Sequence, residues 1–374
     1  MNIGPVIRKE FRQIRRDKRA LGILIFIPAL LLVMVGYALN FDVKHLRVAV
    51  YDEDNTRTSR EFVNSFMHSE YFEYEYHAQS KSEIDQVLND RTAHLALIVP
   101  RSFSETLLSG GQATVQVILD GSNNNTASIA AGYVAAGIQD YSKKILTEWL
   151  EKRGKSVTFP IDVRPKLWYN PDLKTARYLI PGLFGLILMI VTVISTSLSV
   201  VREKELGTME QLKTSPLKSY EIIIGKAIPY VLIALIAATL IMILGAILFD
   251  VRVQGNIFLL YLAILVFLLG GLGQGLLISA LANSQQVAFL VSVFSSLLPS
   301  FLLSGFIFPI KSMPLFLQVI SNVQATKFFL VIVRSIIMKG VGVPAVWEQF
   351  VYLLIFATIT IGISSVRLQR ELSQ

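Results

Sequence analysis

Two Gly-Lys pairs, Gly154-Lys155 and Gly225-Lys226, are the residues of this chain that come nearest to a phosphate-binding loop. Such a loop needs Gly-x-x-x-x-Gly-Lys-Ser/Thr, because its backbone amides and lysine surround the phosphates. Trp149 stands where the first pair needs its leading glycine, and Ala227 follows the second pair where a hydroxyl is needed. The sequence therefore predicts no nucleotide-binding site in this chain.

The sequence supports a metal site no more than it supports a nucleotide site. The chain contains no cysteine, so it has no disulfide framework and no thiolate ligands. Its histidines show no His-Glu-x-x-His pattern, and we expect them to be ordinary surface or hydrogen-bonded side chains. They are His45, His68, His77 and His94. The residue types thus predict no catalytic, cofactor-binding or metal-binding residues.

A long uncharged run decides the class of protein. Residues 253–310 are 58 consecutive residues without a charge. A hydrocarbon core about 30 Å thick takes roughly 20 helical residues to cross, so this run holds two crossings. Similar apolar stretches predict an α-helical polytopic membrane protein with six transmembrane helices, at residues 21–39, 178–201, 228–249, 257–281, 287–308 and 350–366.

The segments between the spans divide the chain. Residues 1–20 read as a basic amphipathic interfacial helix and 21–40 as a retained first span, because no small-residue cleavage site follows it. Residues 41–176 read as an extracytoplasmic α/β domain inserted between helices 1 and 2, because short β-rich runs alternate with helical patterns there. Residues 177–374 carry helices 2–6, an inner loop at 202–220, and two short half-helices at the outer surface within 311–346.

Charge sets the expected orientation. With the N-terminus inside, the inner segments carry 14 basic residues and the short outer segments carry 5. The positive-inside rule then places both termini in the cytoplasm. Basic residues beside apolar spans also argue against nucleic-acid binding. The predicted spans contain no acidic residue, which argues against a proton- or sodium-coupled pump. Energy for any uphill transport would come from another subunit.

The inner loop has more structure than topology requires. Thr208 and Gln211 have capping-box spacing, and Pro216 would stop the short helix that follows. Gly207 allows a sharp bend before that helix. An ordinary solvated loop needs none of these features.

This loop resembles the permease signature of type-2 ATP-binding-cassette (ABC) exporters, in which the stretch reads approximately Arg-Glu-x-Glu-x-Gly-Thr-x-Glu-x-Leu and then Ser/Thr-Pro-Leu. A second stretch, residues 304–309 followed by Met313-Pro314, resembles the outer turn after the family's fifth span. The basic leading helix and the large insertion after span one are similar to the drug- and lipid-exporting branch. The matching residues in the loop are Arg202, Glu203, Glu205, Gly207, Thr208, Glu210, Leu212, Ser215, Pro216 and Leu217.

The resemblance implies a multi-pass permease of the bacterial inner membrane that is not itself an enzyme. Such permeases pair as two halves, here with a second copy or a paralogue, and move hydrophobic or amphipathic substrates. Each half binds a cytoplasmic ABC ATPase, which holds ATP and Mg. Membrane lipid and a periplasmic adaptor are further expected partners; no cofactor is expected on this chain. The expected ATPase-coupling residues are Arg202, Glu203, Glu205, Gly207, Thr208, Glu210, Gln211, Leu212 and Pro216.

Small and hydroxyl residues inside the spans have two interpretations. Ordinary helix packing explains them, and a substrate pathway or dimer interface is the alternative. We expect Pro299 to kink its helix. The residues are Thr192, Ser195 or Thr196, and Ser199 in span two, Gly271, Gly275 and Ser279 in span four, and Ser292, Ser296, Pro299 and Ser304 in span five.

A second class of function stays open at this point. A membrane sensor or adhesin that acts through its external domain would have the same spans and the same insertion. It would need neither an ATPase partner nor the loop signature.

Overall fold

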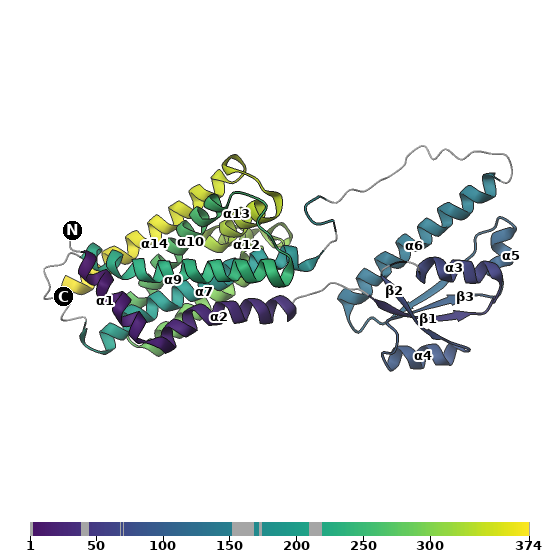
Figure 1. The fold of residues 1–374 in the computed structure, drawn as a ribbon, viewed down its shortest axis with the longest axis horizontal. Coiled ribbons are helices and arrows are strands. Elements are labelled where there is room, and N and C mark those ends of the chain that lie inside the picture. The colour runs from purple at the N-terminus through teal and green to yellow at the C-terminus, as the bar shows by residue number, and fades with distance from the viewer. Residues whose placement is uncertain are drawn as a thin grey trace. The chain divides into compact units, whose positions relative to one another are not determined.

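The structure is a computed structural model that describes residues 3–38, 45–67, 69, 71–151, 168–171, 174–208 and 219–373. The chain forms two compact units. The helical unit comprises Met1–Asn40 and Leu167–Gln374, and the α/β unit comprises Phe41–Lys166. Figure 1 shows the helices of the first unit and the small sheet of the second.

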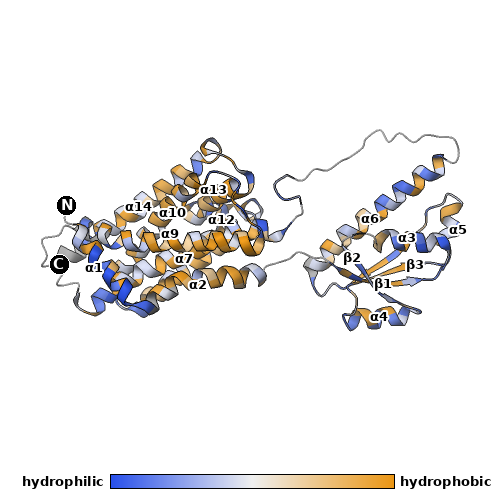
Figure 2. Cartoon of the chain, in the orientation of Figure 1, coloured by the Kyte–Doolittle hydropathy of each residue, from blue (hydrophilic) through white to orange (hydrophobic). Residues whose placement is uncertain are grey.

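The helical unit is built from long apolar helices (Figure 2). It begins with α1 (Ile3–Arg16) and α2 (Lys18–Ala38). Five helices of the described chain are long and apolar enough to cross a membrane, at Thr175–Glu205, Ile224–Phe249, Ile257–Leu281, Gln285–Leu303 and Trp347–Arg367. They lie in α7 (Thr175–Glu205), α9 (Ser219–Phe249), α10 (Ile257–Leu281), α11 (Gln285–Leu303) and α14 (Trp347–Ser373).

These five helices confirm predicted spans two to six. The first predicted span corresponds to α2, whose apolar part, Leu24–Ala38, is shorter than the other five. Polar residues explain where the uncharged run divides. The Asn256 side chain accepts hydrogen bonds from Phe258 N at 2.8 Å and Leu259 N at 3.3 Å, and so begins α10. The Ser284 hydroxyl accepts from Val287 N at 3.3 Å and begins α11.

The segment between α11 and α14 contains two helices that meet at a sharp bend. It contains η1 (Ile310–Ser312), α12 (Leu315–Ile320), η2 (Ser321–Val323), α13 (Ala325–Lys339) and η3 (Val343–Ala345). The helices Leu315–Val323 and Ala325–Lys339 are bent by 85° relative to each other. No side chain of α12 is buried, whereas α13 buries one face among the other helices.

Two charged side chains in α13, those of Arg334 and Lys327, find partners within the fold. Arg334 donates hydrogen bonds to Gly305 O at 2.9 Å and Phe306 O at 3.1 Å, and its guanidinium lies 3.8 Å from the centre of the Tyr178 ring. Lys327 donates to the Ser321 hydroxyl at 2.9 Å. Because these contacts compensate the charges, the apolar face of α13 is free to pack against α7, α10 and α14.

The α/β unit is a four-stranded sheet with helices on both faces. Its strands are β1 (Leu46–Asp52), β2 (Phe72–His77), β3 (Leu95–Val99) and β4 (Gln116–Leu119), in the order β2-β1-β3-β4. Strand β1 pairs in parallel with β2 and β3, and β3 pairs antiparallel with β4. The helices are α3 (Arg57–Met67), α4 (Lys81–Asn89), α5 (Phe103–Leu108) and α6 (Asn124–Glu151).

Alternation along the strands builds two small cores. Val48 and Val50 point to the face covered by α3, α5 and α6, whereas Ala49 points to the face covered by α4. The sequence pattern predicted an α/β domain from its alternating β-rich and helical runs, and the strands and helices of this unit agree with that fold.

Candidate functional site

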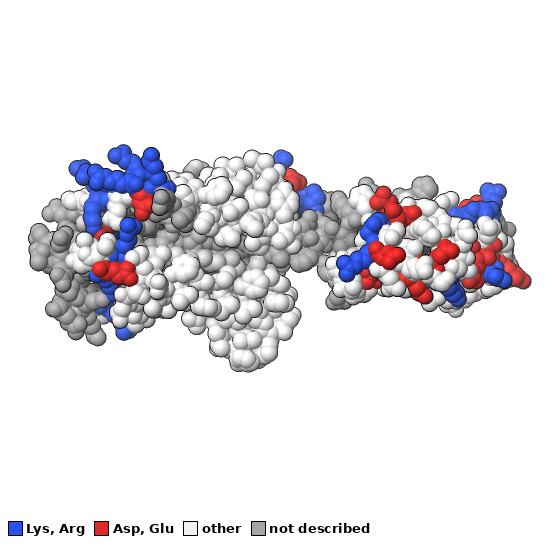
Figure 3. Space-filling view, turned by 90° about the horizontal axis from the view of Figure 1, so that it is seen from below, with Lys and Arg blue, Asp and Glu red and all other residues white. Residues whose placement is uncertain are grey.

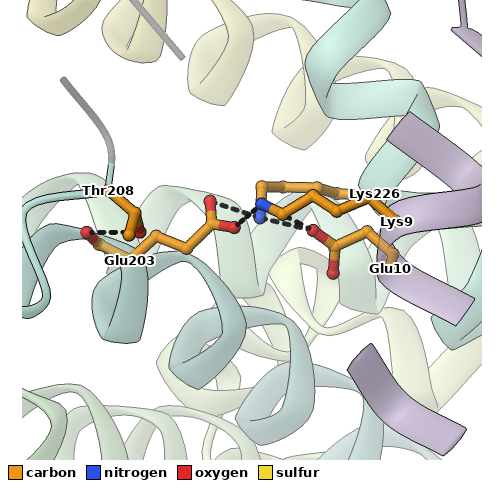
Figure 4. A network of polar contacts seen from close by, with 5 residues as sticks. All are labelled: Lys9, Glu10, Glu203, Thr208 and Lys226. Atoms are coloured by element: carbon orange, nitrogen blue, oxygen red, sulfur yellow. Dashed lines mark hydrogen bonds and ion pairs between the residues drawn. The ribbon is translucent and has the colours of Figure 1, made fainter. Parts of the chain in front are cut away.

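Four charged side chains meet at the end of α7, where the predicted coupling loop begins. Glu203 of α7 forms ion pairs with Lys9 of α1 and with Lys226 of α9 (Figure 4). The Lys226 Nζ atom lies 2.6 Å from Glu203 Oε2 and donates a hydrogen bond to Glu10 Oε1 at 3.0 Å. We call Lys9, Glu10, Glu203 and Lys226 the charge cluster. Its two lysines balance its two glutamates.

The charge cluster is buried, so the balance between its positive and negative charges affects stability. Glu203 is 3% exposed, Glu10 1% and Lys226 5%, and only Lys9 reaches the surface. Taking charges out of water costs several kcal/mol per ion, and only the partners offset that cost. The Lys226–Glu203 contact is an ion pair without hydrogen-bond geometry at Glu203 Oε2. The cluster therefore holds α1, α7 and α9 together only while all of its charges are present.

The leading helix reaches the cluster through close packing on α9. A Cβ atom on Gly225 would lie 2.7 Å from Val6 of α1, so glycine is needed for this approach. The buried face of α1 consists of Val6, Glu10 and Ile14, at helical spacing. Phe11 lies outside this buried face and is 39% exposed, whereas Glu10 takes a buried position to reach Lys226.

The neighbours of Glu203 each contact a different element. Arg202 forms an ion pair with Asp17, between α1 and α2, at 3.3 Å. Lys204 donates to the carbonyl of Ser279 in the last turn of α10 at 2.7 Å. Glu205 accepts from the backbone amide of Gln285, at the start of α11, at 2.7 Å, and also from its side chain.

The signs of these charges match the helix ends that they contact. A cation at the C-terminal end of α10 and an anion at the N-terminal end of α11 are each favoured by the helix dipole. The last turn of α7, residues 202–205, is thus tied to α1, α9, α10 and α11 by four consecutive side chains.

Gly207 and Thr208 follow the last turn of α7. Gly207 has φ +69, a left-handed conformation that permits the bend. The Thr208 hydroxyl donates to Glu203 O at 3.3 Å and thereby closes the end of α7. Its expected capping partner lies outside the described residues, as do the other expected coupling residues beyond Thr208, namely Glu210, Gln211, Leu212 and Pro216.

Four buried hydroxyl groups, three in α7 and one in α11, form a second polar feature. The side chains of Thr192, Thr196, Ser197 and Ser292 are buried, and their oxygens have no hydrogen-bond partner within the described chain. Others of the predicted stripe bond within their own helix: Ser195 donates to Val191 O at 2.5 Å, and Ser296 donates to Ser292 O at 2.6 Å. Ser304 donates to Ser300 O, Ser199 is half-buried, and Pro299 lies within α11.

The predicted small-residue face of α10 packs against α7. A Cβ atom on Gly275 would lie 2.7 Å from Val193 O, and one on Gly271 would lie 3.3 Å from Met189 and Thr192. Ser279 is buried and donates to Leu276 O at 2.7 Å. These contacts lie within one chain and favour the packing interpretation for both glycines.

Sequence reasoning missed the partners of the α7 turn. Lys9, Glu10, Asp17 and Ser279 were not singled out for this site, and Gln285 was read only as part of a break between spans. One signal was available. Glu10 is a lone acidic residue within a strongly basic helix, four residues from apolar Val6 and Ile14, and so lies on its apolar face.

Comparisons with known proteins agree with the apolar helices. A model of the ABC-2 family transporter proteins matches residues 18–366. The chain belongs to the ABC-2 transporter family. Members of this family are membrane subunits of ABC transporters, and they work with an ATPase subunit. This ABC-2 chain is therefore a multi-pass membrane protein, and a stand-alone sensor or adhesin is not favoured.

Three relatives extend this finding over nearly the whole ABC-2 chain. The "Probable multidrug ABC transporter permease YbhR" of Escherichia coli K12 is 33% identical over 358 residues, which cover 96% of this chain and 95% of the relative. The "Probable multidrug ABC transporter permease YbhS" of the same strain is 31% identical, covering 97% and 96%. The "Inner membrane transport permease YhhJ" is 25% identical, covering 99% and 98%.

Proposed function

We propose that this chain is the permease of an ATP-driven exporter that moves a hydrophobic or amphipathic, drug- or lipid-like molecule out of the cytoplasm or the inner leaflet. Two relatives at 31–33% identity carry multidrug names, which supports this substrate class. ATP and Mg would be held by a separate cytoplasmic ATPase. A second copy of this chain or a paralogue would complete the transporter.

One observation supports the coupling role most directly. The loop signature begins in the last turn of α7, where residues 202–205 contact α1, α9, α10 and α11 or their ends. A force applied to the loop by an ATPase would therefore reach several helices at once. A solvated connector would not need such fixed attachments at its root.

The unpartnered hydroxyls of α7 and α11 support a position for the pathway. A buried hydroxyl without a partner costs free energy, and the cost disappears when water or a polar group of a substrate enters. We assign the pathway to the face that contains Thr192, Thr196, Ser197 and Ser292. A movement of α7 away from its neighbouring helices would expose these groups during transport.

Replacing Gly207 with valine should uncouple ATP hydrolysis from transport. A β-branched residue is a strong outlier at φ +69, at a cost of about 1–2 kcal/mol, so the path of the loop must change. We expect substrate-stimulated ATP hydrolysis, measured in lipid with the co-purified ATPase, to fall roughly tenfold, in line with that energy. Gly207→Asn should retain most stimulation, because asparagine tolerates left-handed backbone.

A matched control is available in α14. Gly362 has open space around it, so Gly362→Val adds the same side chain without a clash. Normal stimulated turnover in Gly207→Val would show that the loop is only a connector. Failure of any candidate ATPase to co-purify with the unmodified chain would contradict the proposed exporter itself.

We also propose that both termini are cytoplasmic and that the α/β unit is extracytoplasmic, where it would receive substrate or dock an envelope adaptor. The basic charge of the segments at one end of the spans supports this orientation. The chain has no cysteine, so single cysteines report on position without background. In intact spheroplasts, an impermeant thiol reagent should label Ser122→Cys and leave Arg15→Cys unlabelled until the membrane is permeabilised. The reverse labelling would contradict the proposed orientation.

A further inference from the structure

A basic hollow lies beside α1 in the helical unit. Its volume is about 1090 Å³. Gly4 has no neighbour near its Cβ position, which leaves space on that side. Figure 3 shows Lys and Arg gathered at the end of the helical unit that carries α1. The lining residues are Gly4, Pro5, Arg8, Lys9, Arg12, Gln13, Arg16, Asp17, Lys18 and Arg202.

The positive charge of the hollow is not compensated by the described chain. Arg8, Arg12 and Arg16 are exposed, lie four residues apart on α1, and form no ion pair with any described residue. Among the described lining residues the only carboxylate is that of Asp17, which is paired with Arg202 at 3.3 Å. Like charges four residues apart disfavour a helix, so an anion bound between them would remove that cost.

The basic hollow lies close to the apolar part of α2. Lys18 begins α2, and the apolar part of α2 begins at Leu24, which is about 9 Å further along a helix. Phe26 (65% exposed), Leu30 (41%) and Met34 (61%) then form an exposed apolar face of α2. A phospholipid has a polar headgroup beside apolar acyl chains, so it complements a polar hollow that lies next to an apolar face.

We propose that this hollow binds the phosphate of an anionic phospholipid headgroup, with the acyl chains along the exposed face of α2. Arginine suits this role, because its planar guanidinium binds phosphate oxygens through two hydrogen bonds. Basic pockets at the polar ends of membrane spans bind anionic headgroups for the same reason. The apolar face of α2 favours a lipid over a soluble phosphate or an acidic protein surface. The proposal does not depend on the exported substrate or on an ATPase.

Native mass spectrometry of the purified full-length chain in detergent tests this site. We expect phosphatidylglycerol to bind and phosphatidylcholine, which carries no net charge, to bind much more weakly. The triple variant Arg8→Gln/Arg12→Gln/Arg16→Gln should weaken phosphatidylglycerol binding about 100-fold, at roughly fivefold for each cation. The triple lysine variant should keep most of the affinity, which controls for folding.

Arg15 supplies the matched control, because it is exposed on α1 and does not line the hollow. Arg15→Gln should bind phosphatidylglycerol like the unmodified chain. Unchanged binding in the triple glutamine variant would overturn the proposal. Equal affinity for glycerol 3-phosphate would replace the lipid with a soluble anion. Loss of a co-purifying ATPase with unchanged lipid binding would show that the surface docks a protein.

Discussion

Replacing Glu203 with leucine should destabilise the helical unit by about 3–5 kcal/mol, the cost typical of breaking a buried ion pair on one side. The substitution leaves Lys9 and Lys226 with Glu10 as their only carboxylate in the charge cluster, so the buried group gains a net positive charge. Thermal unfolding of the purified full-length chain in detergent measures the loss. We expect the same variant to lose transport, because α1, α7 and α9 are no longer held together.

Two further variants test whether the loss of stability comes from the charge cluster. Replacing both partners, Glu203→Leu with Lys226→Leu, leaves Lys9 with Glu10 and so restores the balance of charge, and it should recover part of the stability that Glu203→Leu alone loses. Glu61→Gln removes an exposed glutamate that pairs with Arg57 at 2.9 Å, and it should cost less than about 1 kcal/mol. A Glu203→Leu chain as stable as Glu61→Gln would contradict a structural role for the cluster.

Gly275→Ala should cost about 1–3 kcal/mol, the range found for overpacking a close contact. The added methyl group would lie 2.7 Å from Val193 O and 2.9 Å from the Cβ atom of Thr196. The nearer of these atoms belongs to the backbone of α7, so the clash is relieved only when α7 and α10 move apart. The unfolding temperature of the full-length chain should fall accordingly.

Gly271→Ala, one helical turn earlier, is the comparison. Its methyl group would meet the Met189 and Thr192 side chains at 3.3 Å, and these can shift by a few tenths of an ångström. We expect a cost below that of Gly275→Ala. Equal effects at both positions would show that the spacing between α7 and α10 does not depend on the backbone contact at Gly275.

The spans were predictable because hydropathy and helix capping are local properties of the sequence. The uncharged run, Asn256 and Ser284 together indicate where α10 and α11 begin. The burial of α13 was not predictable in this way, because Arg334 and Lys327 read as surface charges. Their partners, such as the carbonyl of Gly305 and the ring of Tyr178, come from distant parts of the chain and are known only from the fold.

The coupling turn was predictable in position and not in its contacts. The bend at Gly207 follows from the residue type, since glycine adopts positive φ readily. The partners of residues 202–205 do not follow, because each depends on how another helix packs. Glu10 shows the reason most clearly. Its burial contradicts the usual preference of glutamate, and it becomes favourable only when Lys226 lies 3.0 Å away.

The contacts of residues 202–205 with α1, α9, α10 and α11 also constrain the length of α7. Each residue turns an α-helix by about 100°. One residue inserted between Val193 and Arg202 would therefore turn every following side chain by about 100°, into the direction that the next side chain along the helix takes now. Arg202, Glu203, Lys204 and Glu205 would then all face the wrong partners, while Gly275 still fixes the helix at Val193. Substitutions here remove contacts singly, whereas an insertion or a deletion removes all of them together. We expect this stretch of α7 to tolerate changes of residue far better than changes of length.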